Sequence, residues 1–279
     1  MFFFSFHLRT SESLMSHYEL IWKDVVSIRE RCPLVLSVTN NVVTNLTANA
    51  LLAIGASPAM SHAAEDAAEL AGLAQAVVLN MGTPESSYVE SMNAAGMAAN
   101  TAHVPIVFDP VAVGATNYRS ATARHLMEKV TMTVIRGNAS EIMSLAGQTA
   151  ASRGVDSLYD GGEAAEAGRS LSSVLDCVVC VSGAEDIVVG KNVLRRIFGG
   201  HELMPRVTGM GCTATAIVGA FLAVNPDPFA ATFHAMAVMS VAGMMAGQNV
   251  AGPASFQVRF LDSLYVLTKK DIETYLHIA

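Results

Sequence analysis

The chain has 279 residues and a formal net charge of −7, and its composition is 52% hydrophobic but only 15% charged. A surface that binds a polyanion needs clustered Lys and Arg, so this balance argues against a nucleic-acid partner. Any anionic ligand must be held locally, by a loop, a metal or a single arginine.

The first residues contain an apolar run that is too short for the core of a signal peptide and has no basic residue ahead of it. Met15 is an alternative start of the protein. Residues 1–14 are then a non-native or disordered extension, and the sequence leaves both alternatives open.

Apolar, β-branched runs alternate with stretches of helical spacing from residue 33 onward. Such strands, alternating with helices, indicate a mostly parallel sheet with helices on both faces. An antiparallel pair is expected within 186–200, followed by a helical C-terminal third, and the absence of repeats or linkers predicts a single α/β domain over 1–279. Strands are predicted at 33–38, 76–81, 105–110, 132–137 and 177–182, and helices at 42–54, 63–74, 86–101, 119–129, 139–147 and 161–175.

Two long apolar runs near the C-terminus suggest membrane helices as an alternative. Between Val207 and Val258 the only charged residue is Asp227. The run 210–224 is short for a membrane span, and the run 229–252 is interrupted by polar residues. Because neither run is flanked by a basic cluster, we interpret both as helices buried in a core or a subunit interface.

The four cysteines, Cys32, Cys177, Cys180 and Cys212, do not resemble a disulfide framework. Cys177 and Cys180 form a CxxC on a predicted strand, where positions three apart point to opposite faces. They therefore cannot share a metal. We interpret them as buried strand residues in a protein of the reducing cytoplasm.

Polar residues gather where the predicted strands end, and an open parallel sheet binds its ligands at that edge. Each of these residues alone could form a turn or cap a helix. Several polar strand ends in so apolar a chain nevertheless predict a binding site. The segments are SVTNN (37–41), NMGT (80–83), FDPVAVGAT (108–116), IRGNASEI (135–142) and VSGAED (181–186).

A glycine loop, VTGMGCTATA, spans residues 207–216. As Gly209-x-Gly211-x-x-Ala214 it matches a loose dinucleotide fingerprint, but it comes late and lacks an acidic strand end about 20 residues on. The alternative is an anion hole, because glycines turn successive N–H groups toward one point and a helix dipole adds positive potential. Cys212 at the helix start would then face the nucleophile of a phosphoryl transfer.

In the same order, between about Pro33 and Phe256, these motifs resemble the hydroxyethylthiazole kinase family. The resemblance implies a ribokinase-like three-layer sandwich. It also implies transfer of the γ-phosphoryl of ATP to the hydroxyl of 4-methyl-5-(2-hydroxyethyl)thiazole, giving 4-methyl-5-(2-phosphooxyethyl)thiazole for thiamine biosynthesis and salvage. A cytoplasmic homotrimer that needs Mg²⁺, with thiazole sites between subunits, is implied as well. The motifs are 37–60, 108–116, 135–142, 181–186 and 207–212.

The same resemblance assigns a role to individual residues. Cys212 stands where most ribokinase-like kinases carry an aspartate base, and a helix N-terminus is expected to lower the pKa of a thiol from its ordinary value of about 8.5. By position, Met60, Gly209 and Asn40 are expected at the substrate, Arg136, Ser182 and Gly211 at ATP, and Asp109 and Glu141 at Mg²⁺, partly through water.

The sequence departs from the family pattern at two positions, and two other classes of protein remain as alternatives. The family often carries histidine at Leu36 and a smaller residue at Met210. Another ribokinase-like kinase, such as a hydroxymethylpyrimidine kinase, would keep the glycine loop but should carry aspartate at Cys212. A non-catalytic membrane or scaffold protein would need the segment 207–258 in lipid.

Overall fold

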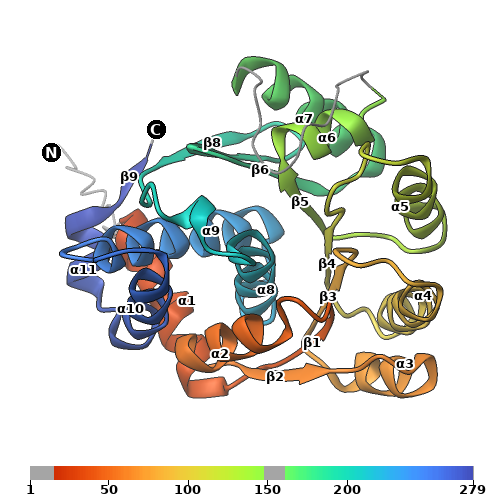
Figure 1. The fold of residues 1–279 in the computed structure, drawn as a ribbon, viewed down its shortest axis with the longest axis horizontal. Helices are drawn as coiled ribbons and strands as arrows, with labels where there is room; N and C mark the ends of the chain where they lie inside the picture. Colours follow the sequence, from red (N-terminus) through yellow and green to blue (C-terminus); the bar gives the residue numbers. More distant parts are fainter. Residues whose placement is uncertain (1–15, 148–160, 279) are drawn as a thin grey trace, which may run out of the picture.

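The computed structural model describes residues 16–147 and 161–278. The proposed alternative start at Met15 and the extension 1–14 lie outside the described residues. A nine-stranded sheet runs through the described part in the order β2-β1-β3-β4-β5-β6-β7-β8-β9 (Figure 1). The strands are β1 (Leu34–Val38), β2 (Ser57–Met60), β3 (Ala76–Asn80), β4 (Ile106–Asp109), β5 (Val134–Asn138), β6 (Val178–Ser182), β7 (Glu185–Val189), β8 (Leu194–Phe198) and β9 (His277–Ile278).

The sheet is parallel from β2 to β6 and antiparallel from β6 to β9. The predicted parallel sheet and the late antiparallel pair are therefore confirmed. The chain runs from β1 outward to β2 and then back past β1 to β3, so the winding direction reverses between β1 and β3. In sheets of this kind the crevice outside such a reversal, at the carboxyl ends of the strands, is the usual place for a ligand.

Helices cover both faces of the sheet, as predicted (Figure 1). On one face lie α3 (Ala64–Leu73), α4 (Ser86–Thr101), α5 (Asn117–Lys129), α6 (Ala139–Leu145) and α7 (Gly161–Leu175). On the other lie α1 (His17–Arg31), α2 (Thr44–Ile54), α8 (Met210–Leu222), α9 (Pro228–Ala246), α10 (Pro253–Val266) and α11 (Lys269–Tyr275). A one-turn 3₁₀ helix, η1 (Met204–Arg206), precedes α8.

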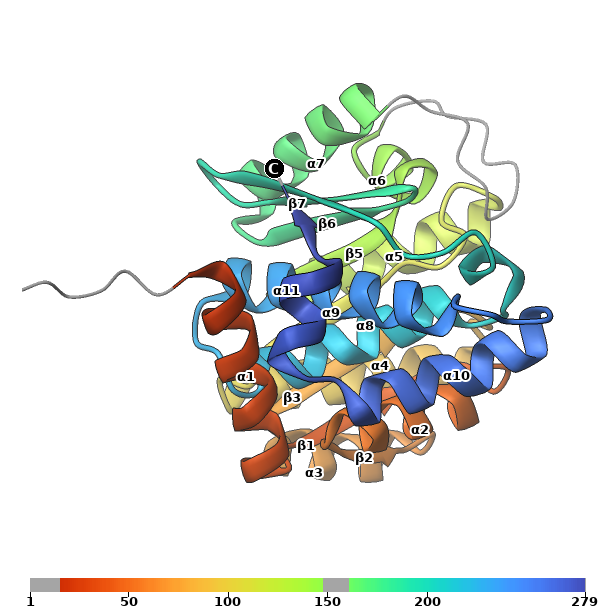
Figure 2. The ribbon, with the colours of Figure 1, turned by 90° about the vertical axis from the view of Figure 1, so that its left-hand side faces the viewer.

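The apolar helices α8 and α9 lie inside the molecule. Figure 2 shows α1, α10 and α11 in front of α8 and α9, with β3 behind these two helices and β6 and β7 above them. Among the described residues α9 alone is long and apolar enough to cross a membrane by length and composition, yet 78% of that stretch is buried within the structure. A helix that is apolar all round belongs in a core, so the interpretation of both runs as buried helices is confirmed.

The two cysteines of the CxxC lie on opposite faces of the sheet. Cys180 packs with the α8 and α9 side, and Cys177 packs with the α7 side. All four cysteines are free thiols. Because side chains alternate along a strand, the two thiols lie on opposite faces of the sheet and cannot reach each other or share one ligand.

Three elements at the periphery were not predicted from the sequence: helix α1, strand β2 and the two-residue strand β9, which pairs with β8. Helix α1 begins at a capping box in which Glu19 N–H donates to Ser16 Oγ and Ser16 N–H to Glu19 Oε2. Strand β2 is a four-residue edge strand that contains Pro58. Proline is tolerated at a sheet edge because no outer neighbour needs its missing N–H.

The packing of α8 on the sheet yields a stability prediction. A Cβ on Gly219 of α8 would come within 2.9 Å of Val78 Cγ2, whereas a Cβ on Gly72 of α3 would meet nothing within 4 Å. Overpacking costs about 1–3 kcal/mol, and the higher helix propensity of alanine contributes about 1 kcal/mol. We therefore expect Gly219→Ala to lower the free energy of unfolding in urea by about 1 kcal/mol and Gly72→Ala to raise it by a similar amount. Two stabilising substitutions would contradict this packing of α8.

Candidate active site at the carboxyl edge of the sheet

A chain of side-chain hydrogen bonds crosses the ends of three neighbouring strands. Asn40 follows β1, Asn80 ends β3 and Asp109 ends β4, and all three are buried. Asn40 Nδ2 donates to Asn80 Oδ1 at 2.8 Å, and Asn80 Nδ2 donates to Asp109 Oδ2 at 2.7 Å. The parallel register places these side chains together at the point where the winding of the sheet reverses.

Helix α8 approaches this chain from the other side. Thr215 Oγ1 donates to Asp109 Oδ2 at 2.8 Å. Cys212 lies on the first turn of the same helix, and its sulfur is 3.9 Å from Asn40 Nδ2. The thiol, the Asn40 amide and the Asp109 carboxylate therefore share one small region, although they are far apart in the sequence.

Two glycines make the start of α8 possible. Gly209 is the N-cap at φ +89°, and a Cβ there would meet Val43 Cγ1 at 2.7 Å. A Cβ on Gly211 would meet Arg136 Nη1 at 2.8 Å. The loop follows η1 and not a strand, so the context of a dinucleotide fingerprint is absent. Among the described residues the N–H groups of Gly211 and Cys212 have no acceptor, which suits an anion at this helix start.

Arg136 lies beneath that helix start, on the buried strand β5. Its guanidinium donates through Nη2 to Ser182 Oγ, and its Nε has no partner in the part of the chain that the structure describes. Burial would lower the pKa of Arg136, but the nearby carboxylates, Asp109 foremost, raise it. A charged guanidinium with unused donors next to free backbone N–H groups can hold phosphate oxygens.

Glu141 both closes a helix cap and lies in this region. Its Oε2 accepts from Asn138 N–H at 2.8 Å and its Oε1 from Ala112 N–H at 2.7 Å, while Asn138 Oδ1 accepts from Glu141 N–H. Asn138 therefore caps this helix, one of the simpler roles that such polar residues can have. The carboxylate is held in one orientation by two backbone N–H groups.

The two carboxylates favour a cation. Burial raises the pKa of Asp109, against the opposing effects of Arg136, Thr215 and Asn80. Burial and the charge of Asp109 raise the pKa of Glu141. Residues 16–147 and 161–278 contain no cluster of three His, Cys, Asp or Glu side chains able to hold a metal by themselves. The donor set therefore fits a hard cation that takes its remaining ligands from water and phosphate oxygens.

The expected pKa shift of Cys212 is wrong in direction. Burial and, after it, the charge of Asp109 raise the pKa of this thiol to about 12, although it lies at a helix N-terminus. The desolvation of the sulfur outweighs the helix dipole. Without ligands, Cys212 is a neutral thiol at neutral pH.

The remaining expected site residues are farther out, and the two departures are buried. Met60 ends the edge strand β2 beside Ser37 of β1 and is half-buried. Leu36 is fully buried in the core on the α3 and α4 side, and Met210 is buried in the core on the α8 side. Both departures therefore contribute to packing, and neither removes a polar group of the site.

Sequence analysis gave no role to three residues of this region. Asn80 belongs to one of the predicted polar strand ends, but its position between Asn40 and Asp109 can be predicted only when the order of the strands is known. Thr215 follows Cys212 by three residues on α8, and its contact with Asp109 can be predicted only when the orientation of that helix is known. Arg119 on α5 donates only to backbone carbonyls, and no sequence pattern indicates such contacts.

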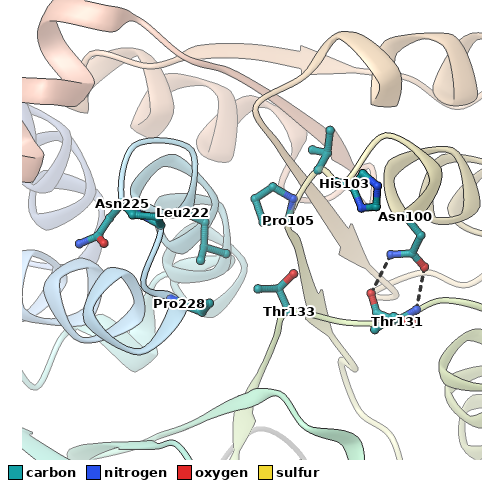
Figure 3. A pocket seen from close by; sticks show the side chains of 10 residues that line it. Asn100, His103, Pro105, Thr131, Thr133, Leu222, Asn225 and Pro228 are labelled. Carbon is teal, nitrogen blue, oxygen red and sulfur yellow. Dashed lines mark hydrogen bonds between the residues drawn. The ribbon is translucent and has the colours of Figure 1, made fainter.

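A cavity of about 590 Å³ lies elsewhere, at the amino ends of the strands. Figure 3 shows Pro105 and Thr133, which precede β4 and β5, facing Leu222 and Pro228 of α8 and α9. His103 and Asn100 line its other side. None of the expected site residues lines this cavity, so we place the chemistry at the carboxyl edge.

Comparison with known proteins gives consistent matches over most of the chain. The model of the "Hydroxyethylthiazole kinase family" matches residues 25–270. A hydroxyethylthiazole kinase of Nitratidesulfovibrio vulgaris (strain DSM 19637 / Miyazaki F) is 50% identical over 265 residues, covering 95% of this chain and 99% of the relative.

Solved structures support the same fold. The structure of a hydroxyethylthiazole kinase protein from Pyrococcus horikoshii OT3 superposes with a TM-score of 0.85 at 39% identity, covering 93% of this chain and 98% of that one. A ribokinase-like superfamily protein from Enterococcus faecalis V583 superposes with a TM-score of 0.62 at 12% identity, covering 85% and 87%. The latter match bears on the fold alone, and it confirms the predicted ribokinase-like architecture.

The raised pKa of Cys212 predicts its reactivity. Cys32 is exposed, whereas Cys212 is partly buried and its pKa is about 12. Since the thiolate is the nucleophile, iodoacetamide should alkylate Cys32 first, and labelling of Cys212 should still accelerate between pH 8 and 10. Mass spectrometry of the peptides measures both rates. A labelling rate of Cys212 that levels off below pH 8 would contradict the raised pKa.

Proposed function

This chain belongs to the hydroxyethylthiazole kinase family, and from that premise we propose that it transfers the γ-phosphoryl of ATP to the hydroxyl of 4-methyl-5-(2-hydroxyethyl)thiazole. The observation that carries the proposal is the meeting of Asp109, Asn40 and Cys212 at the start of α8. Phosphoryl transfer needs an aligned hydroxyl, a cationic clamp and a metal, and little covalent chemistry from the protein.

The substrate hydroxyl is placed between Cys212 and Asn40. Asn40 Nδ2 already donates to Asn80 Oδ1, so its amide is held in a fixed orientation. Gly209 caps the start of α8, and Met60 ends the half-buried strand β2; both would contact the thiazole.

The phosphates of ATP are placed on the opposite side of Cys212. Arg136, held by Ser182, supplies a guanidinium fork, and the free N–H groups of Gly211 and Cys212 face the same region. Preorganised donors of this kind stabilise the charge that builds up on a phosphoryl group in transfer. The bound product, 4-methyl-5-(2-phosphooxyethyl)thiazole, belongs to thiamine biosynthesis and salvage.

Asp109 and Glu141 are the residues that would hold Mg²⁺, partly through water. When bound, the metal neutralises phosphate charge and orients the γ-phosphoryl. Asp109 presents Oδ2 to Asn80 and Thr215, and within the described residues no hydrogen bond reaches its Oδ1. Burial raises the pKa of both carboxylates although Arg136 opposes this, and a bound cation would favour their ionised forms.

On this proposal Cys212 acts as the base only as a thiolate, so it must first give up its own proton to solvent. Its pKa is about 12 in the free protein, and bound Mg²⁺ would lower that pKa by favouring the negative charge. In a loose transition state the attacking hydroxyl becomes acidic only as the new bond forms, so the base takes the proton late. The contribution of such a base is typically about 10² to 10⁴ in rate. Most of the acceleration is left to Arg136, the loop N–H groups and the metal.

We also propose a single-domain, cytoplasmic homotrimer with thiazole sites between subunits. One sheet connecting all described strands supports a single domain, and four free thiols support a reducing compartment. Helix α2 packs against both α10 and the edge strand β2, and α10, α2 and the turn before α2 carry exposed apolar side chains. They are Val42, Leu52, Val258, Tyr265 and Val266. Light scattering tests the trimer.

The proposed activity is tested by a kinase assay with ATP, Mg²⁺ and a panel of thiazole and pyrimidine alcohols. We expect turnover of the hydroxyethylthiazole and none of a hydroxymethylpyrimidine. If only the pyrimidine alcohol were turned over, the assigned substrate would be wrong and the protein would be a hydroxymethylpyrimidine kinase instead.

The metal assignment predicts the effect of removing each carboxylate. Glu141→Gln and Asp109→Asn should fold, because each keeps the shape of the side chain, but should need about 10- to 100-fold more Mg²⁺ for half-maximal rate. Titrating Mg²⁺ at saturating ATP measures this shift. If Glu141 only caps α6, the melting temperature should fall while the Mg²⁺ titration stays unchanged.

The base assignment predicts opposite roles for two substitutions. Cys212→Ala should remain folded and keep a weak rate, reduced by up to about 10² to 10⁴. Cys212→Asp should stay active, because bound Mg²⁺ offsets the repulsion from Asp109. If alanine matches the parent and aspartate is inactive, the thiol only fills space and the base lies elsewhere.

A further inference from the structure

Arg119 lies in the first turn of α5 and uses its guanidinium only on backbone carbonyls. Nη1 donates to Met81 O at 2.9 Å and to Val111 O at 2.8 Å, and Nη2 donates to Gly82 O at 2.8 Å. Met81 and Gly82 follow β3, and Val111 follows β4. One side chain therefore connects the two loops that leave the proposed active site.

Two of these carbonyls belong to peptide units whose N–H groups hold site residues. The unit between Met81 and Gly82 accepts from Arg119 through its C=O and donates from its N–H to Asn80 Oδ1 at 3.0 Å. The unit between Val111 and Ala112 accepts from Arg119 in the same way, and its N–H donates to Glu141 Oε1 at 2.7 Å.

Through each peptide unit, the position of the Arg119 guanidinium determines the orientation of the N–H that Asn80 or Glu141 accepts from. A trans peptide is planar, with its C=O and N–H pointing in opposite directions, and the described chain has no cis peptide. Fixing the carbonyl therefore fixes the direction of the N–H. Consecutive hydrogen bonds also polarise one another, so the charge on Arg119 strengthens both N–H donors.

Both carboxylates of the proposed metal site lie at the ends of these chains. One chain runs from Arg119 through the 111–112 peptide to Glu141. The other runs through the 81–82 peptide to Asn80, which donates to Asp109 Oδ2. Ala112 is also held at φ +57°, a left-handed conformation that an alanine adopts only where its surroundings impose it.

We propose that Arg119 is a positioning residue that fixes Asp109 and Glu141 for Mg²⁺ through these two peptide units. The assignment rests on the proposed kinase function. Lysine cannot replace the fork, because its ammonium is a point charge that cannot reach three separate carbonyls in one plane. Arg124 on the same helix is exposed and makes no hydrogen bond or ion pair with the described residues, so it is a matched control.

The first experiment needs no metal and no turnover. Hydrogen–deuterium exchange is compared in the parent, Arg119→Lys, Arg119→Gln and Arg124→Gln. The amides of Gly82 and Ala112 should exchange at least tenfold faster in Arg119→Gln, with a smaller increase in Arg119→Lys and none in Arg124→Gln. If Arg119→Gln is too unstable, Arg119→Lys alone decides. Unchanged exchange at both amides would overturn the proposal.

The second experiment measures the metal directly. Mn²⁺ binding in the presence of ADP, followed by electron paramagnetic resonance, and the Mg²⁺ activation constant should both weaken about 10- to 100-fold in Arg119→Gln. Arg124→Gln should match the parent. If Arg119→Gln lowers the melting temperature or the rate but leaves the metal affinity unchanged, Arg119 has only a structural role and the proposal is overturned.

A double-mutant comparison separates this proposal from the proposed function. If Arg119 acts through Glu141, Arg119→Gln should shift metal affinity much less in the Glu141→Gln background than in the parent. Additive shifts would overturn the route through Glu141. The proposed function would be refuted if the parent protein turned over no thiazole alcohol, or if Glu141→Gln left its metal affinity unchanged. In either case the exchange rates would still decide whether Arg119 holds the two peptide units.

Discussion

The buried carboxylate of Asp109 is the constraint on which the rest of the structure depends. It lies at the end of a central strand, almost without solvent, and burial raises its pKa. A charge in such a place requires donors and opposite charge close by. Those come from three directions: Asn80 on the next strand, Thr215 on α8, and the positive potential of Arg136 on β5. The strand order and the position of α8 bring these groups together around Asp109.

The donors around Asp109 compensate its charge only in part. Asp109 and Glu141 both keep raised pKa values, and Cys212 beside them is held as a neutral thiol. An added positive charge at this place would favour the ionised forms of both carboxylates. Asp109, Arg136 and Glu141 are buried at this edge of the sheet, whereas the buried Asp24 lies on α1 and contacts His234 of α9.

Much of the fold and of the site could be predicted because the responsible patterns are local. Apolar runs define the strands, and Asn40, Asp109 and Arg136 each follow or end such a run. Three features could not be predicted. The short edge strand β2 contains a proline and has no alternating pattern. The direction of the Cys212 pKa shift depends on burial by distant elements. The role of Arg119 depends on backbone carbonyls, which carry no sequence signature.

The long sequence separations within the site have a consequence for biosynthesis. Asp109 meets Thr215 across 106 residues, and Asn40 meets Cys212 across 172. During translation the sheet edge with its amide and carboxylate side chains is made long before α8 leaves the ribosome. Until α8 and α9 dock, Asp109 lacks the hydrogen bond from Thr215, and two largely apolar helices lack their packing partners. The nascent chain therefore passes through a stage that is both inactive and exposed to aggregation, and phosphoryl transfer begins only when the last third of the chain has folded onto the first.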